Sequence, residues 1–391
     1  MRTGSMASRV VILCLAMLIA QSGLTLYLPS LPAISVSLSA YSDFAALTLT
    51  VFLLGMGMPM LLWPRVSGLI GSRNSLIAAL CLFALGSAGA GLALDTGSFL
   101  ACRFAQGVAA GAISVMVRAM LRDSFHGRKL AEAMSWLSVC FVVSLGLAQL
   151  CGSLLFTFWG WKSTFVISAV ASALIAFTVA RYIPSPSTVS AARPSAERGY
   201  AALLRNPRFI RPVCAGGMGY GVIILFSTCA PGIFQSHYNW SVVEFGLLGI
   251  PVSGAYLMGA LSVRRLVSYR SQEQLLSTGV TALFIGALIT AGGYWLFPYE
   301  AIALWLPYCF LLAIQAVVYP LSLSVAAQAV TTDSVRVMAL TGIIYQLIAA
   351  ACGFAVSFMP PAEPRSFVLA CIALTAVAIL VYVPVGRMPA K

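Results

Sequence analysis

Two polar side chains interrupt an otherwise apolar stretch of this sequence. Arg103 and Gln106 lie three residues apart within an apolar run over 98–120, and Ser114 falls on the same face of a helix formed by that run. Arg103 is about five residues from the end of the run, which at about 1.5 Å per residue corresponds to a depth of roughly 7–8 Å. A cation and an amide on one helix face could contact a polar substrate or belong to a proton relay.

A simpler arrangement would let Arg103 extend to the lipid headgroups while Gln106 makes a hydrogen bond between helices. A charge inside a hydrocarbon layer is costly, however, so we favour an arginine that faces protein or water. The sequence therefore predicts that Arg103 and Gln106 form a functional polar pair.

Other apolar runs carry amide, hydroxyl and aromatic groups at helical spacing. Such groups on an apolar wall suit the binding of an amphipathic small molecule. For any one of them, a hydrogen bond between helices or aromatic packing is the simpler explanation, but as a set they predict a mixed polar and aromatic cavity. The predicted wall residues are Gln21, Thr25, Tyr27, Gln315, Tyr319 and Tyr345.

No grouping of residues predicts catalysis. All ten acidic residues, and both His126 and His237, fall in connections or at the ends of apolar runs. A transporter that carries protons on a buried carboxylate would place one in mid-membrane. No Walker lysine, kinase motif set or Ser–His–Asp grouping is present, so we expect no catalytic residue and no enzyme activity.

The ten cysteines also point away from a cofactor or metal site. They lie inside apolar runs, where cysteine packs as a small hydrophobe. The sequence contains no CxxC motif and no cluster of His and Cys, so neither a bound metal nor a cofactor is expected.

The elements that must position these side chains are membrane helices. Of the 391 residues, 60% are hydrophobic and 8% are charged, whereas soluble domains have about a quarter charged residues. Backbone groups must be satisfied within each segment in lipid, and the runs are continuous rather than alternating, which indicates helices. The twelve predicted spans are 10–29, 43–62, 75–94, 98–120, 134–156, 163–183, 209–234, 242–262, 274–296, 300–322, 335–358 and 366–385.

The positive residues predict the orientation of these spans. Of the 23 lysines and arginines, 20 fall at the termini and in the even-numbered connections, and only Lys162 and Arg365 fall in the others. By the positive-inside rule, both termini are therefore cytoplasmic. The net charge of +13 follows from this topology, so we expect attraction to anionic lipid and no nucleic-acid partner.

A polar stretch divides the spans into two sets of six. Residues 184–208 are rich in proline and serine and predict a cytoplasmic linker between an N-terminal bundle, 1–183, and a C-terminal bundle, 209–391. A layout of six plus six helices is the repeat architecture of many transporters.

Four short motifs resemble those of one transporter family. Residues 25–32 read Thr-Leu-Tyr-Leu-Pro-Ser-Leu-Pro, 103–107 read Arg-Phe-Ala-Gln-Gly, 117–123 read Val-Arg-Ala-Met-Leu-Arg-Asp, and 160–162 read Gly-Trp-Lys. At these spacings the chain resembles the drug:proton antiporters of the major facilitator superfamily, of the bicyclomycin-resistance and multidrug resistance protein D type. The resemblance implies two pseudo-symmetric six-helix bundles around a central site.

One loop departs from the family pattern. The family motif reads Gly-x-x-x-Asp-Arg-x-Gly-Arg-Arg, and here Gly71 and Arg73 remain as expected gating-loop residues while Gly68 replaces the acid. That acid helps to latch the two halves in the family, so gating could differ here. Many relatives also carry an aspartate where Thr25 stands, so proton coupling is not assigned to a named residue.

The sequence therefore predicts an all-α membrane protein with twelve transmembrane helices in the major facilitator fold. We expect a monomeric exporter of amphipathic, drug-like molecules in the bacterial inner membrane that exchanges its substrate for protons by alternating access. Two alternatives remain. One is a dedicated exporter of a single metabolite such as a siderophore, and the other is a non-transporting membrane sensor, which the altered loop favours.

Overall fold

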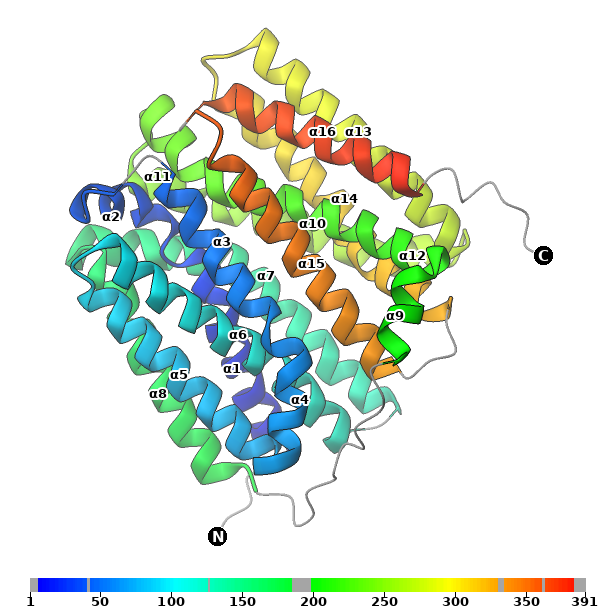
Figure 1. Cartoon of the computed structure of the whole chain (residues 1–391). Coiled ribbons are helices and arrows are strands. Elements are labelled where there is room, and N and C mark those ends of the chain that lie inside the picture. The colour runs from blue at the N-terminus through cyan, green and yellow to red at the C-terminus, as the bar shows by residue number, and fades with distance from the viewer. Residues whose placement is uncertain are drawn as a thin grey trace. The chain divides into compact units, whose positions relative to one another are not determined.

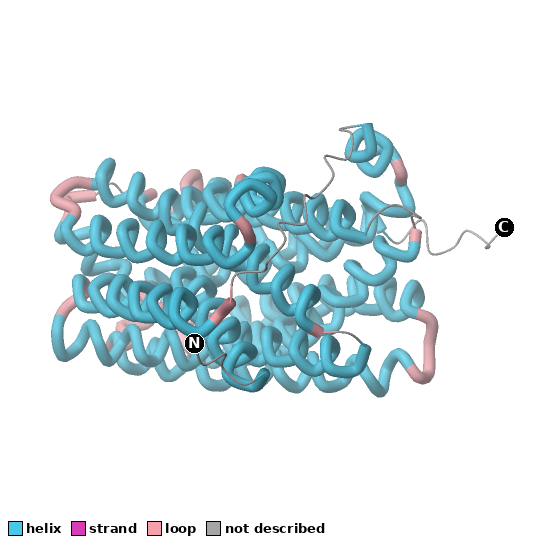
Figure 2. Tube along the Cα trace, turned by 90° about the horizontal axis from the view of Figure 1, so that it is seen from below, coloured by secondary structure: helices cyan, strands magenta, loops and turns pink. Residues whose placement is uncertain are grey.

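The chain folds into long helices joined by short connections. The computed structural model describes residues 6–40, 43–125, 127–184, 198–329, 334–360 and 363–382, and within these ranges it contains helices but no strand (Figure 2). Eleven helical segments of the described chain are long and apolar enough to cross a membrane, and Phe44–Gly57 is a shorter apolar helix. The predicted all-α membrane class is confirmed.

Packing divides the chain into two compact units. The first comprises residues 1–195 with 242–249, and the second comprises 196–241 with 250–391. The helices of the first unit are α1 (Met6–Thr25), η1 (Leu28–Ser30), α2 (Leu31–Ser37), α3 (Phe44–Gly57), α4 (Pro59–Ile70), α5 (Ser72–Leu92), α6 (Thr96–Ser124), α7 (Gly127–Trp159), α8 (Lys162–Tyr182) and α11 (Val242–Leu247).

Close helix contacts in the first unit depend on glycine. Helix α5 packs against α6 and α8, and α3 packs along α6 (Figure 1). A Cβ atom added at Gly107 would meet the carbonyl oxygen of Phe52, and one at Gly111 would meet that of Met56. Gly107 and Gly111 stand four residues apart, so the small-xxx-small spacing lets the two backbones approach.

Two residues explain where the helices between Phe44 and Leu92 begin and end. Pro59 has no N–H group and therefore interrupts the hydrogen-bond ladder after α3, so α4 begins there instead of continuing the same helix. Gly71 then adopts a φ of +83°, a conformation that favours glycine, and separates α4 from α5. The predicted span 43–62 thus covers α3 and only the start of α4.

Aromatic rings fill one end of the first unit. The Phe99 ring lies with its centroid 5.5 Å from those of both Phe44 and Phe165. Phe165 in turn contacts Trp161 at 6.1 Å and Tyr27 at 6.2 Å. This cluster joins the end of α1 to α3, α6 and α8.

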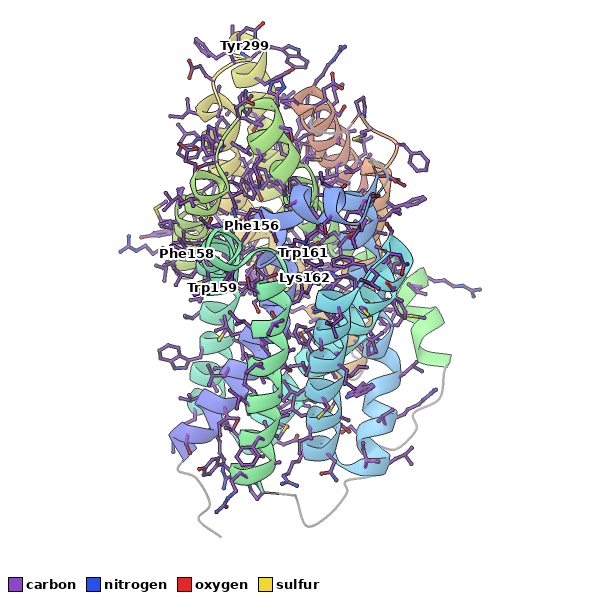
Figure 3. The ribbon with its side chains drawn as sticks, turned by 90° about the vertical axis from the view of Figure 1, so that its left-hand side faces the viewer. Phe156, Phe158, Trp159, Trp161, Lys162 and Tyr299 are labelled. Atoms are coloured by element: carbon purple, nitrogen blue, oxygen red, sulfur yellow. The ribbon has the colours of Figure 1, made fainter. Side chains whose placement is uncertain are left out.

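The turn between α7 and α8 presents further aromatic groups. Phe158 and Trp159 are 70% and 71% exposed. Next to them, Lys162 Nζ lies 5.5 Å from the ring centroid of Trp161. Figure 3 shows these residues around one turn. Aromatic side chains at helix ends are typical of the membrane–water boundary.

The second unit contains α9 (Arg198–Arg205), α10 (Pro207–Gly232), η2 (Ile233–His237), α12 (Gly249–Val267), α13 (Gln272–Leu296), α14 (Ile302–Gln328), α15 (Ser334–Val356) and α16 (Pro364–Tyr382). Its core joins α10, α14 and α16. The Phe226 and Tyr308 rings stack at 3.6 Å, and the Phe367 ring packs edge-on against Phe226 at 5.8 Å.

The predicted linker is partly helical. Residues 198–205 form α9, in which Leu203 is buried at 3% exposure, so this part of 184–208 packs as an amphipathic turn rather than an extended connection. Residues 185–197 and both termini lie outside the described residues. The division into 1–183, 184–208 and 209–391, and the cytoplasmic termini, stay predictions.

Several helices run past their predicted spans. Helix α7 has 33 residues and α6 has 29, whereas about 20 suffice to cross the hydrocarbon layer. Hydropathy detects the apolar stretch, but the backbone ladder continues through the polar residues beyond it. The predicted span 10–29 differs from the structure in another way. Helix α1 ends at Thr25, and the short helices η1 and α2 continue to Ser37.

Candidate functional site

Arg103 is the centre of a buried polar cluster in the first unit. Its side chain is 1% exposed. Nη1 donates a hydrogen bond of 2.7 Å to Gln106 Oε1, and Nη2 donates one of 3.0 Å to the carbonyl oxygen of Gly23. The arginine therefore faces protein, as the sequence predicted, and it connects α6 to α1.

Two aromatic faces enclose the guanidinium group. Arg103 Cζ lies 4.1 Å from the ring centroid of Tyr27 and 4.5 Å from that of Phe52. Both distances are within the range of cation–π attraction, which strengthens when the cation is removed from water. Tyr27 follows α1 and Phe52 belongs to α3, so three segments of the first unit converge on one charge.

Gln106 connects this cluster to α5 through a hydrogen bond. Its Nε2 donates to Ser87 Oγ at 2.7 Å, and the Ser87 hydroxyl donates to the carbonyl oxygen of Phe83 at 2.7 Å. In this series of hydrogen bonds the Ser87 hydroxyl both accepts and donates. Neither the guanidinium, the amide nor the hydroxyl group titrates near neutral pH. The cluster thus orients a permanent charge, and a proton carrier would have to be another group.

The groups that contact Arg103 in the described chain are all neutral. Its partners are a backbone carbonyl, an amide oxygen and two aromatic faces, and its buried Nε has no hydrogen-bond partner in the described chain. Asp43 and Asp95 stand before α3 and α6, and no carboxylate of the described chain bonds to Arg103. An unpaired charge in low dielectric remains electrostatically unsatisfied and attracts anions.

The remaining predicted residues of the first unit take different positions. The Thr25 hydroxyl donates to the carbonyl oxygen of Ser144 at 2.5 Å, which ties the end of α1 to α7. Gln21 is 7% exposed on α1. Ser114 is fully buried on α6, and its hydroxyl has no hydrogen-bond partner in the described chain. Tyr27 is part of the Arg103 cluster because its ring faces the guanidinium group. Thr25 belongs to a separate contact between α1 and α7.

The second unit has a neutral counterpart of this cluster. Gln315 on α14 is 2% exposed and donates from Nε2 to the carbonyl oxygen of Gly216 at 3.3 Å, while its Oε1 has no partner in the described chain. The hydroxyl groups of Ser322 and Tyr345 share a hydrogen bond of 2.5 Å. The rings of Tyr319 and Tyr345 meet edge to face at 5.3 Å.

Two more tyrosines extend this group. Tyr220 on α10 hydrogen-bonds to the Gln346 side chain and lies near Tyr319. Tyr256 on α12 lies near Tyr220 and Tyr319. Phenol and amide groups from four helices therefore gather in one region, which offers hydrogen bonds and aromatic faces without formal charge.

The predicted gating-loop residues hold a helix connection. The Arg73 Nη2 group donates a hydrogen bond to the carbonyl oxygen of Ala180 on α8, while Gly71 provides the backbone turn described above. A Cβ atom placed at Gly68 would meet nothing within 4 Å. The site of the missing acid is therefore open.

Sequence reasoning missed several members of these clusters. Gly23, Phe52 and Ser87 are ordinary residues of apolar runs, and only the tertiary packing brings them to Arg103. Tyr256 could have been noticed as a tyrosine within an apolar run, but nothing in its spacing connects it to α14. Among the described residues, no group of three or more His, Cys, Asp or Glu could hold a metal ion.

Comparison with known proteins identifies the family. The sequence profile of the Major Facilitator Superfamily matches residues 13–354. The uncharacterized MFS-type transporter YdgK of Bacillus subtilis is 30% identical over 245 residues, which are 60% of this chain and 61% of that protein. The multidrug transporter MdfA of Yersinia pestis is 26% identical over 268 residues, covering 68% of this chain and 65% of MdfA. The matches thus span a little under two thirds of these relatives.

Solved structures agree on the fold. The crystal structure of a D-xylose-proton symporter superposes with a TM-score of 0.79 at 14% identity, covering 98% of this chain and 99% of that one. An inward-facing bacterial homologue of the lysosomal transporter Spinster gives 0.66 at 15% identity, covering 97% and 95%. The chain belongs to the Major Facilitator Superfamily.

Proposed function

We propose that this member of the Major Facilitator Superfamily exports amphipathic, drug-like small molecules across a bacterial inner membrane in exchange for protons. The observation that carries the proposal is the burial of polar groups within apolar helices, with a charged cluster around Arg103 and a neutral one around Tyr345. Buried polar groups in membrane helices are costly and mark substrate pathways. The similarity to MdfA, which is named a multidrug transporter, supports export of drugs.

The two units would alternate access to a central site, with both termini in the cytoplasm. Arg103 and Gln106, with Tyr27, Gln21, Thr25 and Ser114, would contribute from one bundle, and Gln315, Tyr319 and Tyr345 from the other. In this proposal Arg103 is a fixed positive anchor, because a guanidinium group does not lose its proton in proteins. We assign the exchanged proton to no named residue, because the described spans carry no carboxylate at mid-membrane.

Reconstituted transport tests this proposal. The purified full chain in proteoliposomes should move a fluorescent amphipathic dye, and an imposed pH gradient should accelerate this movement. The variant Gln106→Leu should slow it, because it removes both the acceptor for Arg103 and the donor to Ser87. If the rate of dye transport does not change with the pH gradient, proton exchange is refuted, but the protein is still a transporter.

The open position at Gly68 favours a second candidate, a membrane sensor that uses the same fold without transport. In that case the reconstituted protein should bind the dye, as measured by fluorescence anisotropy, without moving it. A panel of chemically unrelated dyes separates a multidrug exporter from one dedicated to a single metabolite. The first should transport several members of the panel and the second none.

A further inference from the structure

Two thiol groups meet where α1 packs against α7. Cys14 lies on α1 and Cys140 on α7, and the Cys140 thiol donates a hydrogen bond of 3.5 Å to the carbonyl oxygen of Cys14. The two thiols lie within hydrogen-bonding range of each other. Both cysteines are reduced and partly exposed. Two sulfur atoms from different helices are thus adjacent, and neither is sealed in the core.

We propose that Cys14 and Cys140 form a dithiol site that binds soft, thiophilic electrophiles able to take two sulfur ligands, with trivalent organoarsenicals as the class that fits. Packing as small hydrophobes would explain single cysteines, but it does not require two thiols to touch across a helix contact. Soft ligands such as cysteine sulfur select soft acceptors.

The reaction needs no oxidant. An arsenoxide, R–As=O, takes up both thiols to give R–As(S–Cys14)(S–Cys140) and one water. Two As–S bonds form, the bond between arsenic and oxygen breaks, and the two thiol protons leave with the oxygen. Arsenic stays trivalent throughout, so no electrons are transferred, and a competing small dithiol reverses the reaction.

Occupation of this site would clamp α1 to α7. The same two helices are joined by the hydrogen bond from Thr25 to Ser144, and α1 also supplies the Gly23 carbonyl that binds Arg103. A bridge between the helices restricts their relative movement near that cluster. Inhibition of transport by the arsenical therefore rests on the proposed function, whereas formation of the adduct does not.

The test uses the purified full chain and phenylarsine oxide. Intact-mass spectrometry should show uptake of one reagent with loss of one water, and peptide mapping should show that N-ethylmaleimide labelling of Cys14 and Cys140 falls at least about tenfold together. Ethanedithiol should restore the labelling. Each of Cys14→Ala and Cys140→Ala should abolish the adduct, with folding checked by circular dichroism melting.

Cys81→Ala is the matched control, because Cys81 is an exposed thiol on α5 with no cysteine bonded to it in the described chain. This variant should form the adduct as the wild type does. An adduct that survives in Cys140→Ala would overturn the proposal. So would a wild-type protein in which Cys14 and Cys140 stay equally reactive towards N-ethylmaleimide after treatment with the arsenical.

Discussion

The central carbon of the Arg103 guanidinium group lies over the Tyr27 ring, 4.1 Å from its centroid. At the same time its two terminal nitrogens reach Gln106 and Gly23. A planar cation can do both, because its faces and its edge are used for different partners. An ammonium group has no such division and would have to give up one of the contacts.

We therefore expect Arg103→Lys to impair transport although it keeps the charge. A hydrogen bond to a charged group contributes about 1.5–3 kcal/mol, and the loss of roughly 1.4 kcal/mol from a transition state slows a reaction about tenfold. Dye transport in proteoliposomes should fall by about that factor. Arg118→Lys is the control, since Arg118 is exposed on the same helix and bonds only to its own helix at Ser114 in the described chain. Equal activity of the two variants would exclude a role for the planar group.

The contact between α3 and α6 predicts a large difference between two glycine substitutions. Gly107→Ala introduces a methyl group against the Phe52 carbonyl oxygen, whereas Gly68→Ala meets nothing. Overpacking of this kind costs about 1–3 kcal/mol. Thermal unfolding in detergent should show a lower midpoint for Gly107→Ala and an unchanged or higher one for Gly68→Ala. Similar midpoints would mean that the helices separate at no cost.

The unpaired charge predicts a preference among substrates. Because no described carboxylate neutralises Arg103, a neutral or anionic dye should be transported faster than a cationic dye of similar size. Arg103→Gln should reduce this difference, since it removes the repulsion of the cation. The measurement compares initial rates for matched dyes at low and high salt. Faster transport of the cation by the wild type would contradict the prediction.

Asp95 predicts a pH effect on stability. Its carboxylate accepts hydrogen bonds from the Ser98 N–H at 2.9 Å and the Ser98 hydroxyl at 2.7 Å, and these bonds hold its pKa below the ordinary 3.8. A lowered pKa in the folded state stabilises the protein above that ordinary value, and the contribution is lost as the pH falls through the lowered pKa.

Asp95→Ala should therefore melt at a lower temperature than the wild type at pH 7, and the gap should close as the pH falls below 3.8. Asp95→Ser supplies another good N-cap. Its melting temperature should stay near that of the wild type at pH 7, and its difference from Asp95→Ala should persist in acid. Differential scanning fluorimetry across pH would show a constant gap for Asp95→Ala if the hydrogen bonds were unimportant.

Much of the fold was predictable, because lipid leaves the backbone few choices. The apolar runs marked the helices. The division at Pro59 and the short helices after Thr25 were missed, since hydropathy does not register a local break in the ladder. Helix α9 was missed because it has only eight residues, with an arginine at each end.

The candidate site was predictable only on its own helix. The spacing of Arg103 and Gln106 placed them on one helix face, and in the structure they share a hydrogen bond of 2.7 Å. Their functional role stays a prediction. Their partners on other helices depend on how α1, α3 and α5 pack, which no local pattern encodes. The pairing of Cys14 with Cys140 was hidden for the same reason, since 126 residues separate them.

The acceptor that Arg103 uses on α1 is a main-chain oxygen, which every amino acid possesses. No substitution at position 23 can remove it chemically. A Cβ atom added at position 23 would lie 3.2 Å from the Phe52 ring and 3.1 Å from the Phe83 ring, so a larger side chain would press on both rings. The tether between the first helix and the buried cation can therefore be severed by displacing the backbone, and a search for inactivating mutations at Gly23 should recover bulky residues rather than polar ones.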